Sequence, residues 1–315
     1  MNLDYKILWI DDNLQSYIDN NSVKSIEEFL SDRGFEPIIE TVVDESDVID
    51  ESNKDNPLFR RDYDVIISDF NLLETNGDKV IRKIRDTWKI DADILLYSAK
   101  TDYKNDSNAQ NNLAFIDRVT FHFGRETLLE RIEELIELTL RKLLELNATR
   151  GLITAATSYL DVEIEHLFFL LIDLDGNKEL KQKIENIFIT DCKETEKYAL
   201  KKCQAKRDCH TSDYKQYFSL SESFRKFDIL KELLKLKNIN GFDLNLFKQY
   251  GIDVIDVRNK FAHAKAEKIE GRMVLKGRDD TGGFEFDETK CIEIRKSLIA
   301  HKNNISALKK ILSES

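Results

Sequence analysis

A chain of 315 residues with 41% hydrophobic content is long enough to form two ordinary domains. No run approaches the ~18 uninterrupted apolar residues of a membrane-spanning helix, which argues against a membrane protein. Residues 1–150 carry 19 Lys and Arg against 32 Asp and Glu, a net charge of −13, whereas residues 151–315 carry 29 against 27, a net charge of +2. The acidic first half repels nucleic acid and suits a cation-binding pocket, and the nearly neutral second half excludes a strongly basic DNA-binding domain.

The first half alternates short apolar runs with amphipathic helical patterns. Near-continuous apolar strands between helices are typical of a parallel sheet covered on both faces, so we expect an α/β fold with a doubly wound, five-stranded sheet. The expected strands are Lys6–Ile10, Pro37–Val42, Tyr63–Ser68, Ile94–Tyr97 and Val119–Phe123. The expected helices are Ser22–Arg33, Gly77–Thr87 and Thr127–Leu146.

The pattern changes to long helices near residue 150, which predicts two domains, 1–147 and 148–315. In the second domain, Gly and Asn punctuate the ends of the expected helices. These helices cover about 152–173, 178–206, 214–237, 242–250, 253–265 and 288–312. A small β-hairpin is expected from Arg272–Lys276 and Gly283–Phe286. The leucine-rich stripe of the helix after Arg125 predicts packing against the first domain's own core or, alternatively, a dimer contact.

Cysteine usage and the N-terminus indicate the compartment. The four cysteines contain no CxxC pair, and Cys203, Cys209 and His210 match no common zinc spacing. The N-terminus lacks the basic region and apolar core of a signal peptide. We therefore expect reduced thiols and a cytoplasmic protein.

Polar residues follow three of the expected strands. The first strand ends in Asp11 and Asp12, the third in Asp69 and the fourth in Ser98. In a doubly wound sheet, functional groups collect at the carboxyl ends of the central strands. Carboxylates gathered there form a hard, oxygen-rich site that suits Mg²⁺, which takes a substrate phosphate as a further ligand.

This set of residues, over about residues 4–146, resembles the response-regulator receiver family. The loop Asp69-Phe-Asn-Leu-Leu-Glu-Thr-Asn-Gly77 has the family's spacing between phosphoacceptor and glycine. The resemblance implies a flavodoxin-like fold and phosphorylation of Asp69 by a histidine kinase or another phosphodonor.

The resemblance also implies roles for the neighbouring residues. Asp11 or Asp12, together with Asp69, would bind Mg²⁺ through side chains, and Asn71 through its backbone carbonyl. Ser98 would contact the phosphoryl oxygens. Two departures from the family pattern concern Leu73, which replaces a proline, and the lysine after strand five, which is absent.

The end of the fifth strand leaves two questions open. Arg125 is the nearest cation to the missing lysine, and it either substitutes for that lysine or leaves phosphorylation slow or replaced by another input. The aromatic residue that would respond to phosphorylation is either Phe121 or His122.

A second motif lies late in the helical half. The run Arg258-Asn-Lys-Phe-Ala-His263 combines a phosphate-binding guanidinium with an imidazole that moves protons near neutral pH. Arg258 and His263 are about 140° apart on an ideal helix, so a shared site would need two copies of the helix across a dimer. In the alternative interpretation the motif is catalytically inactive, and Arg258 forms an ion pair with Asp256 or Glu267.

This run resembles the motif of the HEPN family of small helical domains, over about residues 150–312. Many members are metal-independent RNases that act as dimers, and others are inactive binding modules. The resemblance implies that Arg258 binds the scissile phosphate, His263 acts as acid or base on the ribose 2′-hydroxyl, and Asn259 orients one of them.

The sequence thus predicts a response regulator whose receiver controls a HEPN-like endoribonuclease, with RNA as substrate and a homodimer as the active form. The helical domain is expected to need no cofactor. The alternative is a non-catalytic regulator whose helical domain dimerises or binds a protein. DNA is not expected as a partner, since neither half is basic and no helix-turn-helix pattern stands out.

Overall fold

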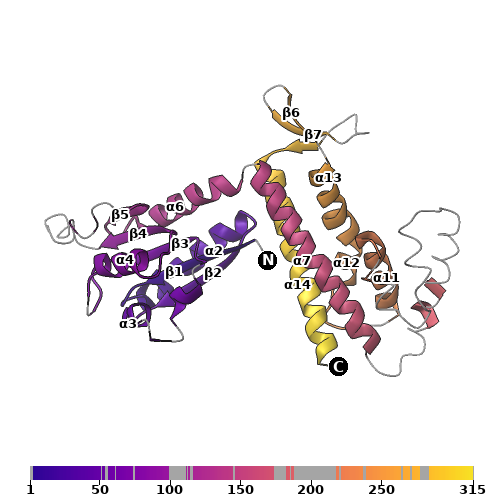
Figure 1. Cartoon of the computed structure of the whole chain (residues 1–315), viewed down its shortest axis with the longest axis horizontal. Helices are drawn as coiled ribbons and strands as arrows, with labels where there is room; N and C mark the ends of the chain where they lie inside the picture. Colours follow the sequence, from indigo (N-terminus) through magenta and orange to yellow (C-terminus); the bar gives the residue numbers. More distant parts are fainter. Residues whose placement is uncertain are drawn as a thin grey trace. The chain divides into compact units, whose positions relative to one another are not determined.

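Five parallel strands form the sheet of the first unit, Leu3–Thr149, in the order β2-β1-β3-β4-β5 (Figure 1). The strands are β1 (Asp4–Ile10), β2 (Glu36–Val42), β3 (Val65–Asp69), β4 (Asp93–Ser98) and β5 (Val119–Phe123). This is the flavodoxin-like order of doubly wound sheets. The predicted five-stranded parallel sheet is confirmed.

The computed structural model describes most of the chain. For some further residues, including His263, it describes only the backbone. The described residues are 3–314 except 51, 54–55, 61, 74, 99–110, 112, 114–115, 145, 174–181, 185, 188–217, 220, 237–238, 264, 270–271 and 277–283.

Helices cover both faces of the sheet because successive strand residues point to opposite sides. On one face, Ile7, Trp9 and Ile67 share a buried cluster with residues of two helices, α2 (Ser22–Asp32) and α6 (Leu128–Leu143). On the other face, the alternate strand residues pack against α4 (Gly77–Asp86) and α3 (Ser46–Ile49). Two short elements complete this unit, α1 (Gln15–Asp19) and the 3₁₀-helix η1 (Pro57–Arg60).

The leucine-rich helix after Arg125 packs into the core of its own unit. Leu128, Ile132, Ile136 and Leu140 of α6 are fully buried in the cluster that contains Trp9. One of the two predicted roles, core packing, is therefore observed, and the dimer contact stays a prediction.

The second unit, Arg150–Ser315, consists mainly of helices. They are α7 (Leu146–Asp173), α11 (Ser223–Lys235), α12 (Leu244–Tyr250), the π-helical segment η3 (Gly251–Asp256), α13 (Val257–His263) and α14 (Glu288–Ser313). α7 and α14 lie side by side, linked by an ion pair between Glu163 Oε2 and Lys309 Nζ at 2.7 Å (Figure 1). None of the helices in the described ranges has the length and apolar character needed to cross a bilayer.

The helix predicted over about 253–265 ends slightly earlier, at His263, and the strand that follows it was not predicted. Residues 265–269 form this strand, β6 (Lys265–Ile269). The predicted hairpin is confirmed as the antiparallel pair of β7 (Arg272–Lys276) and β8 (Phe284–Phe286). β6 pairs antiparallel with β7 and adds a third strand to this sheet. Ala, Glu and Lys favour helices intrinsically, and pairing with β7 overrides this weak preference. The predicted helix over 178–206 lies mostly outside the described residues.

Candidate functional site

Three carboxylates meet at the carboxyl ends of β1 and β3. Asp11, Asp12 and Asp69 each place an oxygen within 4.8 Å of the others. Asp11 and Asp69 are buried, and Asp12 is partly exposed at the rim. The topology produces this arrangement, since β1 and β3 are adjacent parallel strands whose ends lie at the same edge.

The cluster is electrostatically unfavourable without a cation. Burial, together with the negative charges of Asp11 and Asp12, raises the pKa of Asp69 to about 6. Burial and the charges of Asp11 and Glu45 also raise the pKa of Asp12. A divalent cation between the carboxylates offsets their mutual repulsion, and an all-oxygen donor set fits Mg²⁺.

Two aromatic side chains position Asp11 from the interior of the sheet. The hydroxyl of Tyr97 donates a hydrogen bond to Asp11 Oδ2, and the indole Nε1 of Trp9 donates to the Tyr97 oxygen at 3.1 Å. The backbone N–H of Asn13 donates to Asp11 Oδ1 at 2.6 Å. Both oxygens of Asp11 are thus fixed, so this carboxylate has a defined orientation toward the cluster.

The loop after β3 connects Asp69 to Ser98. The backbone N–H of Asn71 donates to Asp69 Oδ1 at 3.2 Å, and the Asn71 amide donates to Ser98 Oγ at 2.9 Å. Ser98 is buried at the end of β4. Hydrogen bonds therefore connect the three predicted site residues Asp69, Asn71 and Ser98.

Gly77 closes this loop because no side chain fits there. A Cβ at Gly77 would lie 2.3 Å from the carbonyl oxygen of Asp69 and 2.8 Å from Leu96 Cδ1. The Gly77 N–H donates to the Phe70 carbonyl at 2.8 Å. These contacts give a physical reason for a glycine eight positions after Asp69. Leu73 stands where the receiver family has proline, and its side chain is 73% exposed, so packing does not constrain the residue type there.

Arg125 lies over an aromatic ring. Its guanidinium carbon is 5.9 Å from the centre of the Tyr17 ring, and it forms no ion pair within the described part of the chain. The Tyr17 ring is 6.2 Å from that of Tyr97, the residue that holds Asp11. Because Arg125 follows the carboxyl end of β5 in a parallel sheet, it lies at the same edge of the sheet as the acidic cluster.

The two aromatic candidates on β5 differ in their surroundings. The Phe121 side chain is 38% exposed. The His122 ring Nε2 lies 3.3 Å from Thr127 Oγ1. Phe121 and His122 both border a small hollow beside Ser98, so the identity of the aromatic residue that responds to phosphorylation stays a prediction with two candidates.

In the second unit, Arg258 links three helices. Its Nη1 donates to Asp161 Oδ2 of α7 at 3.0 Å and to Ser223 Oγ of α11 at 3.2 Å. Ser223 in turn donates to Asp161 at 2.7 Å, and the Arg258 Nε and Nη2 atoms lie 3.4 and 3.3 Å from Asn259 Oδ1. The interpretation of the motif as inactive named the wrong partners for Arg258, because Arg258 forms its ion pair with Asp161 of α7.

The three motif residues are only partly brought together. Arg258 and Asn259 interact directly, and His263 is the last residue of α13. The side chain of His263 lies outside the described residues, so its predicted role stays a prediction. Sequence reasoning missed Asp161 and Ser223, which are 97 and 35 residues away from Arg258 and carry no local motif.

Among the comparisons with known proteins, the search of solved structures found proteins that are similar to this chain. No protein-family model and no curated protein sequence matches the chain. A two-component response regulator from Cytophaga hutchinsonii aligns with 19% identity and a TM-score of 0.33, over 44% of this chain and 97% of its own. A chemotaxis response regulator of Vibrio cholerae aligns with 23% identity and a TM-score of 0.28, over 42% of this chain and 98% of its own.

Proposed function

We propose that the first unit is a receiver domain of two-component signalling and that Asp69 accepts a phosphoryl group. The observation that carries the proposal is the group of three carboxylates within 4.8 Å of one another at the ends of β1 and β3. The group is connected to Ser98 through Asn71. A histidine kinase or a small phosphodonor would supply the phosphoryl group.

The chemistry is attack by a carboxylate oxygen of Asp69 on the phosphorus of the donor. An O–P bond forms, the bond between phosphorus and the donor's leaving group breaks, and the leaving group takes the electron pair. Mg²⁺, when bound, neutralises the charge that builds up on the phosphoryl oxygens. The Asp69 and Asp11 carboxylates, the rim carboxylate of Asp12 and the backbone carbonyl of Asn71 would hold it.

Two further side chains would act on the phosphorylated form. The Ser98 hydroxyl, held by the Asn71 amide, would donate to a phosphoryl oxygen. Arg125 would supply the cation that the receiver family takes from lysine. This role requires the guanidinium to move away from the Tyr17 ring, so it would contribute in the phosphorylated state.

Mass spectrometry of the intact protein tests this proposal. Incubation with Mg²⁺ and acetyl phosphate should add one phosphoryl group to the wild type and none to Asp69→Asn. Asp64→Asn is the matched control, because Asp64 is another partly buried acid beside β3 that accepts a backbone hydrogen bond from Lys6 at 2.8 Å. An unlabelled wild type, under conditions that label a standard receiver, would refute the proposal.

For the second unit we propose a HEPN-like, metal-independent endoribonuclease that the receiver controls. The supporting observation is the fixed orientation of Arg258, whose guanidinium is bonded by Asp161, Ser223 and Asn259 five residues before His263. An immobilised guanidinium is suited to stabilising a phosphate in the transition state. Two copies of α13 in a homodimer would complete the site.

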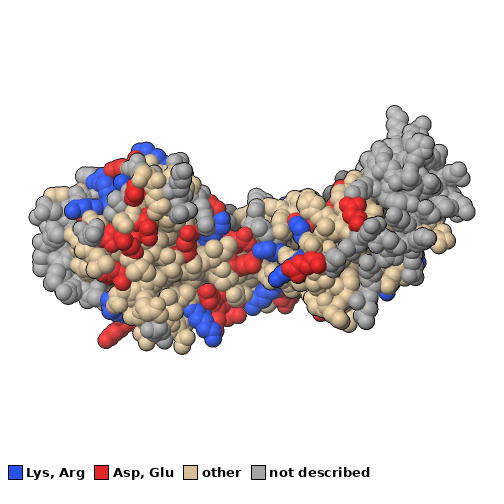
Figure 2. All heavy atoms as spheres, turned by 90° about the horizontal axis from the view of Figure 1, so that it is seen from below, with Lys and Arg blue, Asp and Glu red and all other residues tan. Residues whose placement is uncertain are grey.

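Two observations favour the non-catalytic alternative. The Arg258–Asp161 ion pair cross-links α13, α7 and α11, which is a sufficient structural reason for an arginine at this position. On the face seen in Figure 2, the described lysines and arginines also lie among acidic side chains instead of forming one basic surface. In this alternative, the helical unit dimerises or binds a protein.

An RNA cleavage assay in EDTA separates the two functions. The ribonuclease proposal requires cleavage of RNA but not of DNA, loss of cleavage in His263→Ala, and fragments that end in a cyclic phosphate. His166→Ala is the control, because His166 is an exposed histidine of α7. Absence of cleavage in both phosphorylation states would favour the binding module.

A further inference from the structure

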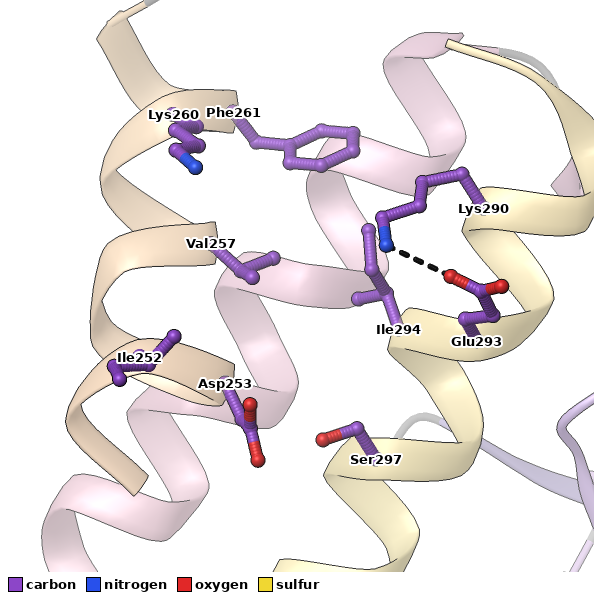
Figure 3. A pocket seen from close by; sticks show the side chains of 9 residues that line it. All are labelled: Ile252, Asp253, Val257, Lys260, Phe261, Lys290, Glu293, Ile294 and Ser297. Carbon is purple, nitrogen blue, oxygen red and sulfur yellow. Dashed lines mark hydrogen bonds and ion pairs between the residues drawn. The ribbon is translucent and has the colours of Figure 1, made fainter. Parts of the chain in front are cut away.

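A cavity of about 300 Å³ lies in the second unit between two helical walls. One wall is the π-helical segment η3 with α13, and the other is the first part of α14 (Figure 3). This volume is at the lower end of the range for small-molecule sites. π-Helical segments are rare and occur often at functional sites.

The middle of the cavity is apolar. Val257 and Phe261 project from α13, and Ile294 faces them from α14 (Figure 3). Phe261 and Ile294 are almost fully buried, so they form a fixed wall. A ligand that fits between them gains binding free energy because its own apolar surface is buried.

One end of the cavity is acidic. Asp253 of η3 lies there, with the Ser297 side chain facing it from α14 (Figure 3). The ring Nε2 of His301, which is fully buried, lies 3.1 Å from Asp253 Oδ2. Burial lowers the pKa of His301, so the ring is neutral and donates to Asp253 without cancelling its charge. Asp253 is therefore an oriented carboxylate with its other oxygen available to a ligand.

The opposite end is basic. Lys260 of α13 lines this end of the cavity and forms no ion pair in the described ranges (Figure 3). Across from it, Lys290 is paired with Glu293 at 2.7 Å. Lys260 is therefore the available positive charge at this end, and Asp253 is the available negative charge at the other.

We propose that this cavity binds a small zwitterion with an apolar body, whose ammonium pairs with Asp253 and whose carboxylate pairs with Lys260. Asp253 and Lys260 are seven positions apart, about 10 Å along a helix. Because an α-amino acid carries both charges on one carbon, it is too short to reach both ends. An ω-amino acid and an apolar dipeptide both have the required separation. The site is independent of Arg258, which turns instead to α7 and α11.

Isothermal titration of the full-length protein tests the proposal with named probes. The probes are ε-aminocaproate and valyl-leucine, each compared with analogues that lack one charge: hexanoate, hexylamine, N-acetyl-valyl-leucine and valyl-leucine amide. At least one zwitterion should bind saturably, and removal of either of its charges should weaken binding about tenfold or more. Binding of ε-aminocaproate would identify the ligand as an ω-amino acid, and binding of valyl-leucine would identify it as an apolar dipeptide.

Variants connect the binding to the cavity. Lys260→Met should weaken binding about tenfold and remove the preference for the free carboxylate over the amide. Ser297→Phe should abolish binding by filling the acidic end. Lys248→Met, at an exposed lysine of α12, is the control and should bind like the wild type.

The proposal fails if neither zwitterion saturates the protein at millimolar concentration. It also fails if Lys260→Met, with an unchanged circular dichroism spectrum, binds both probes as tightly as the wild type. Lys260 is exposed, so its replacement leaves the fold intact and keeps the test decisive even if Ser297→Phe unfolds.

Discussion

Tyr97 donates a hydrogen bond from its hydroxyl to the carboxylate of Asp11, although the two residues are 86 positions apart in the chain. Tyr97 is the next-to-last residue of β4, and Asp11 follows β1 on the far side of β3. The hydrogen bond therefore spans the central strand beneath the acidic cluster. It couples the orientation of a proposed metal ligand to the strand that carries Ser98.

Tyr97→Phe should weaken Mg²⁺ binding. Removal of the hydroxyl leaves Asp11 with the hydrogen bond from the backbone N–H of Asn13, and loss of a residue that orients a metal ligand typically costs about 10–100-fold in affinity. Tryptophan fluorescence measures this well, because both tryptophans of the chain lie in the first unit and Trp9 contacts Tyr97. Tyr63→Phe removes a similar bond, to Glu40 at 2.6 Å, and should leave Mg²⁺ affinity unchanged.

Asp69→Asn should stabilise the metal-free first unit near neutral pH. The pKa of Asp69 is raised to about 6 in the folded state, chiefly by burial, from its ordinary value of 3.8. The folded protein therefore binds more protons than the unfolded chain between these values, and its stability falls as pH rises through this window. Above about pH 7 the variant should be more stable by about 1–3 kcal/mol.

Urea unfolding in EDTA, followed by tryptophan fluorescence, checks this pH dependence. The stability difference should shrink as the pH falls and vanish below about pH 3, where the carboxyl is protonated in both states. Saturating Mg²⁺ should reverse the order and favour the wild type. A variant that is less stable than the wild type at every pH in EDTA would contradict the prediction.

Gly77→Ala should destabilise the first unit by about 1–3 kcal/mol, because the new methyl group overlaps the Asp69 carbonyl and forces the loop to move. The same movement should slow phosphorylation of Asp69. Gly151→Ala is the matched control in α7, where a Cβ meets nothing within 4 Å, and it should be neutral or slightly stabilising. Urea unfolding and intact mass measure the two effects, and equal stabilities of the two variants would show that the loop has room.

The sheet could be predicted from the sequence because its central strands are continuous apolar runs. Val65–Asp69 is buried at every position, which is the signature of a strand covered on both faces. β6 could not be predicted in this way. Lys265–Ile269 is mostly polar and partly exposed, and its strand conformation depends on pairing with β7, which a helical propensity pattern does not reveal.

The acidic cluster could also be predicted, since Asp11, Asp12 and Asp69 follow strands whose ends must lie at one edge. The residues that orient these side chains could not. Tyr97 looks like an ordinary apolar strand residue, and Glu45, which adds charge beside Asp12 and accepts a hydrogen bond from the Thr75 N–H at 3.0 Å, lies in a loop region without a motif. Their roles depend on tertiary contacts across many residues.

Arg258→Ala and Asp161→Ala should each destabilise the second unit, and the double variant should be little worse than the more harmful single one. The two side chains are 26% and 24% exposed, so solvent limits their coupling energy to about 1 kcal/mol. Urea unfolding of the wild type, the two single variants and the double variant, followed by far-UV circular dichroism, measures this coupling energy. Lys231 and Asp228 form a control pair of similar exposure within one helix, α11, with an expected coupling of about 0.3 kcal/mol. Fully additive effects of Arg258→Ala and Asp161→Ala would show that the cross-link does not stabilise the helices, and would leave phosphate binding as the better explanation for Arg258.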